Sequence, residues 1–121
     1  MAMTEDDVRA IALSLPNVEE TIAYGKPAYK AFGKFLTRVR KEDASIVLVG
    51  VTFDEREMLM EAEPDTFHIT PHYKDYPSVL ARLAHVDPGT VRAMLERRWR
   101  EVAPKKFLKE YDARGPAVRP G

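Results

Sequence analysis

The sequence predicts an α+β domain in which helices pack on an antiparallel sheet, and three observations lead to that class. Two segments have apolar residues at helical spacing behind a capping residue, one β-branched run is typical of a buried strand, and glycine or proline turns separate shorter strand-like segments. The 121 residues suffice for one domain with its own core. We expect this domain to span residues 1–113 and residues 114–121 to form a flexible tail.

The first helix is predicted to follow Thr4, a capping residue, with Asp7 as a favourable charge in the first turn. From Val8 onward, apolar residues recur at i, i+3, i+4 and i+7 until Pro16 ends the helix. Residues 19–24 are expected to form the first strand. Glycine and proline in residues 24–27 then indicate a turn.

The next two strands are predicted to form a hairpin, because Gly33-Lys34 suits a two-residue type II′ turn with glycine first. This register pairs Phe32 with Phe35 and Tyr29 with Arg38. One face is then expected in the core, with Ala28, Phe32, Phe35 and Val39. The opposite face carries Tyr29, Ala31, Leu36, Arg38 and Arg40.

The second half of the chain supplies the remaining elements. Residues 45–51 are continuously apolar, which predicts a central strand covered on both faces. Asp54 is expected to cap a helix through Glu63, with Met58, Leu59 and Ala62 inward, and strands are expected near 66–70 and 78–84. Asp87-Pro88 predicts a third helix to about Ala103, with a short helix at 106–112. The predicted order is α-β-β-β-β-α-β-β-α.

The amino-acid composition excludes several classes of protein for this chain. The chain has no cysteine, which excludes disulfides, thiolate metal sites and cysteine nucleophiles. No apolar run approaches the roughly 20 residues of a membrane span, and the first residues lack the apolar core of a signal peptide. We therefore expect a cytoplasmic monomer with no membrane association.

The sequence offers little that predicts catalysis. Glycine-rich nucleotide loops, a phosphate loop and a serine nucleophile motif are absent, so we expect a non-enzymatic protein without a cofactor. His68 and His72 are four residues apart and could share one face of a strand, but no third metal ligand is evident. We therefore predict no metal site and expect both histidines to bond to the backbone.

Positive charge is concentrated although the net charge is zero, because 13 of the 19 basic residues lie in residues 26–41 and 92–109. An aromatic ring among cations suits phosphate contact with base stacking, so one hypothesis is weak nucleic-acid binding. Its predicted contacts are Tyr29, Lys30, Lys34, Arg38, Arg40, Lys41, Lys105 and Lys106. The alternative is a solvated sheet face with a cross-strand cation–π pair.

A second candidate surface is the turn at residues 71–77, which two prolines stiffen and two tyrosines enlarge. His72, Tyr73 and Tyr76 would bind a small ligand or a protein partner there, or the rings would fold back on the sheet. Arg98 falls inside the apolar stripe of the third helix, so it needs a carboxylate, strand carbonyls, solvent or a bound anion. Trp99 in the same stripe is expected in the core.

Residues 70–106, with LPNVEET at 15–21 and the segment Gly33-Lys34-Phe35, resemble the MmcQ/YjbR family of small bacterial proteins. The resemblance covers most of residues 5–107. It implies a small sheet of frataxin-like layout, also described as a double wing, and DNA binding, the activity with which family members are commonly labelled. Where many relatives place a lysine in the fourth strand, this chain has Val49-Gly50-Val51.

Overall fold

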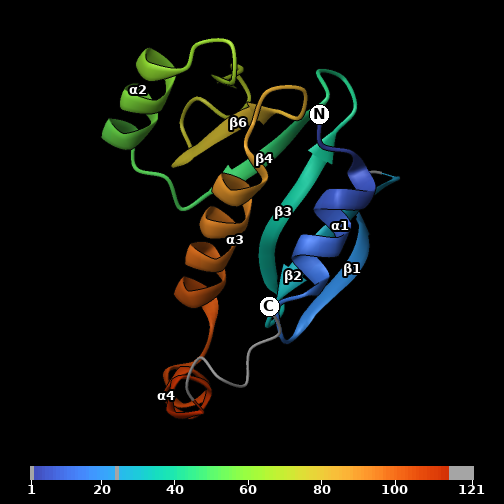
Figure 1. Ribbon diagram of the computed structural model, residues 1–121, viewed down its shortest axis with the longest axis vertical. Helices are drawn as coiled ribbons and strands as arrows, with labels where there is room; N and C mark the ends of the chain where they lie inside the picture. The colour runs from blue at the N-terminus through green and yellow to red at the C-terminus, as the bar shows by residue number, and fades with distance from the viewer. Residues whose placement is uncertain (1, 24, 115–121) are drawn as a thin grey trace.

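The computed structural model describes residues 2–23 and 25–114, and this part of the chain forms one antiparallel sheet with helices on it (Figure 1). The strands lie in the order β1-β2-β3-β4-β6-β5. The elements are α1 (Glu5–Leu13), β1 (Val18–Ala23), β2 (Lys26–Ala31), β3 (Lys34–Arg40), β4 (Ser45–Val49), α2 (Phe53–Ala62), β5 (Phe67–His68), β6 (Ser78–Arg82), α3 (Pro88–Val102) and α4 (Lys105–Ala113). The predicted class and element order are confirmed. Residues 115–121 of the predicted tail lie outside the described part.

The helix caps follow from local sequence. Thr4 and Asp7 form a capping box, in which each side chain accepts the backbone N–H of the other at 3.1 and 2.9 Å. Asp87 caps α3 by accepting the Thr90 N–H at 3.1 Å. The predicted cap of α2 is wrong, because Thr52, not Asp54, accepts the Glu55 N–H. Thr52 has the extended backbone that a capping residue needs.

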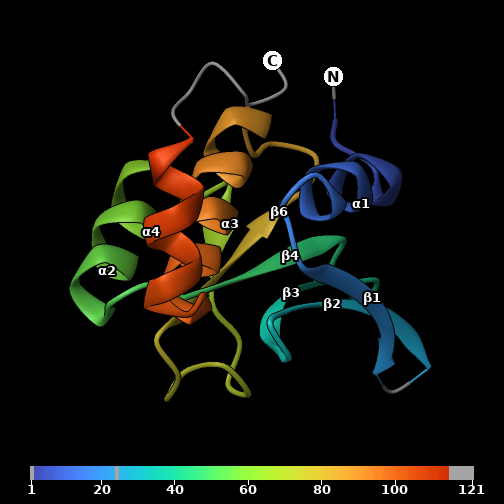
Figure 2. The ribbon, with the colours of Figure 1, turned by 90° about the horizontal axis from the view of Figure 1, so that it is seen from below.

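The core lies between the sheet and the helices α1 and α3, which cover the same face (Figures 1 and 2). β4 is a central strand, with Ile46, Val47 and Leu48 at most 1% exposed, as its apolar run predicts. Trp99 is fully buried, and its indole N–H donates to the Pro16 carbonyl at 2.8 Å. The predictions of a central strand and a core tryptophan are therefore confirmed.

The predicted register of the β2–β3 hairpin is wrong, by two residues at the turn and by one residue beyond the bulge. Phe32 and Gly33 both have positive φ and form the turn, so that Ala31 pairs with Lys34 and Lys30 with Phe35. Leu36 has no partner in β2 and is the extra residue of a bulge. We attribute the left-handed conformation of Phe32 to packing, because its ring lies 5.9 Å from Trp99 and 5.0 Å from Phe107.

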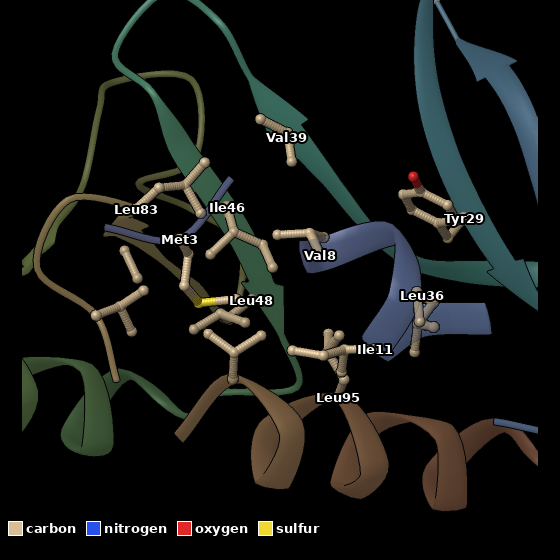
Figure 3. Close-up of a cluster of buried hydrophobic side chains, with 14 of the residues drawn as sticks. Met3, Val8, Ile11, Tyr29, Leu36, Val39, Ile46, Leu48, Leu83 and Leu95 are labelled. Atoms are coloured by element: carbon tan, nitrogen blue, oxygen red, sulfur yellow. The ribbon is translucent and has the colours of Figure 1, made fainter. Parts of the chain in front are cut away.

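The change of register moves Tyr29, Ala31 and Leu36 from the expected outer face into the core. Tyr29 is 3% exposed, and Figure 3 shows it on the side of the sheet that faces α1. Phe35, expected in the core, is only half-buried. Tyr29 pairs with the buried Thr37 instead of Arg38, which turns its ring inward. The bulge at Leu36 exchanges the faces only at the start of β3, where Leu36 is buried and Phe35 is not.

Helix α2 and strand β5 also depart from the prediction. Met58 is 66% exposed and Ala62 is exposed, whereas Leu59 packs against the core as expected. The buried residue of α2 is Arg56. β5 is limited to two residues, since the chain leaves the sheet before Pro71.

Strands β3 and β4 pair at Val39 with Ile46 and at Arg40 with Ser45, and then separate. Figure 1 shows the two strands diverging toward the C-terminal end of α3. This separation leaves strand carbonyls without a neighbouring strand and opens the sheet. The candidate functional site lies there.

Candidate functional site

A cavity of about 720 Å³ lies where β3 and β4 diverge. Phe35 forms one wall, and Val49 and Gly50 at the end of β4 form another. The loop before β6 and the last turns of α3 complete the lining with His72, Tyr73, Tyr76, Arg98 and Glu101. The lining therefore brings together all four residues of the predicted ligand surface, although they come from two distant segments. We call this site the aromatic cavity and residues 71–77 the aromatic turn.

Arg56 of α2 holds the aromatic turn in place. Its guanidinium donates to the carbonyls of Lys74 at 3.0 Å, Tyr76 at 3.1 Å and Ser78 at 3.2 Å. The guanidinium carbon lies 4.8 Å from the centre of the Phe53 ring, on the solvent side of α2. Arg56 is 8% exposed, so these bonds satisfy a buried charge. Arg56 is not among the predicted site residues. Its one signal in the sequence is that residues 54–65 contain six acidic residues and a single basic one, Arg56.

Two arginines of β3 support the aromatic turn from the sheet. Arg38 donates to the Tyr73 hydroxyl at 2.8 Å, and the Arg40 guanidinium carbon lies 5.5 Å from the centre of the Tyr73 ring. Both arginines therefore share one face, as predicted, and it is the face that the turn covers. Tyr73 is half-buried, whereas Tyr76 is 59% exposed. One ring thus folds back on the sheet while the other faces solvent.

Arg98 occupies the opening between the diverging strands. Its Nε donates to the Phe35 carbonyl at 3.2 Å, and its Nη1 lies 3.6 Å from Glu101 Oε1. The side chain is 26% exposed. Arg98 thus has both of the protein partners that were considered for it, a strand carbonyl and a carboxylate. Its side chain also lines the cavity.

Gly50 forms the wall beside Glu101. Its φ of +77° is in the left-handed region, where other residues are strained. A Cβ at this position would overlap the Glu101 carboxylate, whose Cδ would lie at 3.2 Å. Val49 and Gly50, in the segment where the family resemblance leads us to expect a lysine, therefore form an uncharged cavity wall in this chain.

Ion pairs neutralise much of the positive charge in the two basic segments. Lys26 bonds to Glu42 and lowers the pKa of that carboxyl to about 2. Arg40 contacts both Glu42 and Asp43. In α3, Arg97 bonds to Glu55 at 2.9 Å, and Arg100 bonds to Asp112 at 3.0 Å. Because these acidic partners lie outside the two basic segments, counting charges along the segments overestimates the free charge.

Tyr29 does not offer a ring for base stacking. It is buried, and its hydroxyl contacts a Glu20 oxygen at 3.5 Å. Burial first, and then the Glu20 charge, raises the pKa of the Tyr29 phenol. The predicted place of Tyr29 on an exposed nucleic-acid face is therefore wrong, since the shifted hairpin register turns its ring inward.

The predicted lysines remain at the surface. Lys30, Lys34, Lys41, Lys105 and Lys106 are all exposed. The 5.0 Å contact between Phe32 and Phe107 places the hairpin tip beside the start of α4. We call Lys30, Lys34, Lys105 and Lys106 the lysine patch. The two basic segments thus approach each other here.

The two histidines considered for metal binding have different neighbours. His68 Nε2 lies 2.9 Å from the Ser45 hydroxyl and 3.7 Å from Asp43, and burial lowers the pKa of the imidazole. The His72 ring packs edge-on against Tyr73. Within residues 2–23 and 25–114, no three histidine or carboxylate side chains gather into a possible metal site.

The fold and the cavity together define a small α+β sheet domain with an aromatic site beside its opened sheet. Among the described residues, no helix is long and apolar enough to cross a membrane. The YjbR family matches residues 13–101, and the chain belongs to that family. Uncharacterized protein Mb2600 of Mycobacterium bovis and Uncharacterized protein Rv2570 of Mycobacterium tuberculosis are each 30% identical to it, over 89% of this chain and 95% of theirs. No solved structure gives a significant match.

Proposed function

We propose that this protein is a non-enzymatic binding module and that the aromatic cavity is its small-ligand site. The observation that carries the proposal is the convergence of His72, Tyr73, Tyr76 and Arg98 on one cavity. A volume of about 720 Å³ suits a small molecule. Concave, mostly apolar sites with a few polar groups are typical ligand sites.

The anchoring of the aromatic turn supports binding of a ligand without large rearrangement. Arg56 fixes three carbonyls of this region, and Arg38 fixes the Tyr73 hydroxyl. Side chains that are held before binding lose little entropy when a ligand arrives. The cavity is therefore a preformed site rather than one that the ligand must create.

The chemistry of the lining supports binding rather than catalysis. The Ser78 hydroxyl donates to the Tyr76 carbonyl at 3.4 Å, and among the described residues no hydrogen bond joins a lining hydroxyl to His72. The Glu101 carboxylate lies beside Arg98. A nucleophile paired with a base is thus not assembled in this cavity.

A cavity-filling variant tests the proposed site. Ligand-observed NMR of a metabolite library should detect compounds that bind the wild type and are lost in Val49→Phe, because the larger ring occupies the space beside Gly50. Met58→Phe is the matched control, since Met58 is exposed on α2 and does not line the cavity. Compounds that bind Val49→Phe as well as the wild type would place the ligand site elsewhere.

We propose weak DNA binding in the cytoplasm as the second candidate function, and the lysine patch favours it. The four lysines are exposed around the contact of the hairpin tip with α4, which suits phosphate groups. Labelled duplex DNA should bind with an affinity that falls steeply with salt, with log K against log[salt] sloping by about −0.9 per phosphate contact.

Charge reversal at the hairpin tip tests this second function. Lys30→Glu with Lys34→Glu should abolish DNA retention, and both side chains are exposed, so the fold should persist. Arg92→Glu, on the first turns of α3, is the control and should retain most binding. A salt-independent affinity, or equal loss in the control, would exclude the lysine patch as a specific phosphate contact.

A further inference from the structure

We propose that the aromatic cavity binds a small planar aromatic molecule bearing one carboxylate, with the carboxylate on Arg98 and the ring against the tyrosines of the aromatic turn. This inference rests on the proposed small-ligand function and specifies the class of ligand. Three properties of the lining lead to it: the donors left on Arg98, the balance of charge around the cavity, and the aromatic surfaces of its walls.

Arg98 retains hydrogen-bonding capacity that the protein does not use. A guanidinium carries five N–H donors, and in Arg98 the Nε donates to Phe35. Nη1 lies 3.6 Å from Glu101, which is longer than a hydrogen bond. In the described part of the chain neither Nη atom has a hydrogen-bond acceptor, and the side chain is 26% exposed. The free fork matches the two oxygens of a carboxylate.

The charges around the cavity favour an anionic ligand over a cationic one. Aromatic linings can also hold quaternary ammonium ions, so the sign of the surrounding charge decides between the two. Arg98 lines the cavity, and Arg38 donates to the Tyr73 hydroxyl from the sheet side without an ion-pair partner among the described residues. Arg40 also lies against the Tyr73 ring, but Glu42 and Asp43 balance its charge. The opposing charge in the lining is Glu101, whose side chain is 46% exposed and therefore partly screened by water. Glu101 offsets Arg98, so the unbalanced charge beside the cavity is that of Arg38, and it favours an anion.

The walls favour a flat hydrophobic ring. Phe35, Tyr73 and Tyr76 contribute aromatic surface, and Gly50 contributes a wall without a side chain. Tyr76 is 59% exposed although it borders an apolar cavity, so a bound ring would cover surface that now faces water. Burial of such surface and offset stacking both stabilise an aromatic ligand.

Three small aromatic probes test the ligand class: naphthoate, naphthylmethanol and benzyltrimethylammonium. Each is titrated into the full chain at constant ionic strength, and the amide NMR signals of Val49 and Gly50, which line the cavity, report binding. We expect naphthoate to bind at least about tenfold more tightly than naphthylmethanol, because the alcohol leaves the Arg98 fork unpaired. Benzyltrimethylammonium should bind most weakly.

Substitution of Arg98 tests the anchor. Arg98→Gln should weaken naphthoate about tenfold or more and leave naphthylmethanol unchanged, and Arg98→Lys should recover part of the loss by restoring charge without the fork. Arg92→Gln is the control, because Arg92 is an exposed arginine of the same helix outside the cavity lining. It should bind naphthoate like the wild type.

Tyr76→Ala provides a second variant, because Arg98→Gln also removes the bond to Phe35. The Tyr76 ring is exposed and Arg56 contacts its backbone carbonyl, so the replacement should leave the fold intact. Naphthoate should bind several-fold more weakly, whereas Met58→Ala, which removes an exposed side chain away from the cavity, should have no effect.

The outcomes separate this inference from the proposed function. If the alcohol or the ammonium compound binds as well as naphthoate, and Arg98→Gln has no effect, the cavity is a ligand site but not for aromatic carboxylates. If none of the probes shifts the cavity signals, the ligand class fails, and the small-ligand function is decided by the library comparison of the wild type with Val49→Phe. Selective naphthoate binding that depends on Arg98 and Tyr76 supports both.

Discussion

In the β2–β3 hairpin the fold buries Tyr29 and leaves Lys30 and Lys34 in solvent. In the aromatic turn it exposes Tyr76 and places arginines beneath the chain. The two segments have similar residue types. Lys26 and Arg40, at the far ends of the two hairpin strands, are paired with nearby carboxylates. Arg56, which reaches the turn, bonds to backbone carbonyls.

This difference concerns what a cation contributes in each setting. A surface ion pair adds little stability and is weakened by salt. A buried guanidinium that satisfies several carbonyls fixes the backbone and cannot be removed without leaving polar groups unpaired. The hairpin therefore supplies exposed charge, while the aromatic turn supplies a fixed shape. Four predictions test this contrast, from the largest expected effect to the smallest.

The packing that joins the hairpin to α3 and α4 should be the most costly to remove. Trp99→Ala should destabilise the protein by about 3–5 kcal/mol, because a fully buried ring is replaced by a cavity. Denaturant unfolding measures the loss, and the emission of the single tryptophan of the wild type should be blue-shifted. A red-shifted, readily quenched emission would place Trp99 at the surface.

The contrast between anchored and surface arginines should appear in a pair of variants. Arg56→Met should cost about 2–3 kcal/mol, since it removes charged hydrogen bonds to three carbonyls. Arg97→Met should cost less than about 1 kcal/mol, because the side chains of the Arg97 pair with Glu55 are 44% and 32% exposed and solvent screens them. Chemical denaturation compares them. Equal losses would show that Arg56 does not anchor the turn.

Gly50→Ala tests the cavity wall. We expect the free energy of unfolding to fall by about 1–2 kcal/mol, because alanine is strained in the left-handed backbone conformation of Gly50. The overlap with Glu101 should add little, because the end of that side chain can move. Repeating the substitution in Glu101→Ala should therefore give a coupling energy below about 0.5 kcal/mol. A large coupling would show that Glu101 is held rigidly against this wall.

The smallest effect concerns pH and His68. Burial, followed by the charge of Arg82, lowers the pKa of the folded imidazole below its ordinary value. The unfolded chain thus binds more protons than the folded chain at low pH. His68 therefore lowers the stability of the fold as pH falls below about 6.5 and has no such effect well above that pH.

His68→Gln isolates this contribution. Its stability should fall less steeply than that of the wild type below pH of about 6.5, because glutamine does not titrate. Denaturation midpoints at a series of pH values give the two curves. Parallel curves would mean that burial does not lower the pKa of His68 in the folded protein.

Features that depend on neighbours along the chain could be predicted from the sequence. The capping box at Thr4, the Asp87 cap, the central strand β4 and the element order all rest on local residue patterns, and the structure confirms them. The aromatic turn and Arg98 were identified as a candidate surface for the same reason: two prolines and two tyrosines lie within residues 71–77, and Arg98 interrupts an apolar stripe. These signals are contained in short windows of sequence.

The register of the hairpin and the shape of the cavity were decided by tertiary contacts. Phe32 takes a left-handed conformation that local propensity disfavours, and contacts with Trp99 and Phe107, 67 and 75 residues further along the chain, stabilise it. That shift buries Tyr29. The anchor Arg56 could not be recognised, because its partners are carbonyl groups that every residue has and that only the folded chain brings within reach. The sequence by itself thus determined the elements and most of the residues of the candidate site, while long-range packing and backbone bonding, which carry no local signature, decided which side chains meet in it.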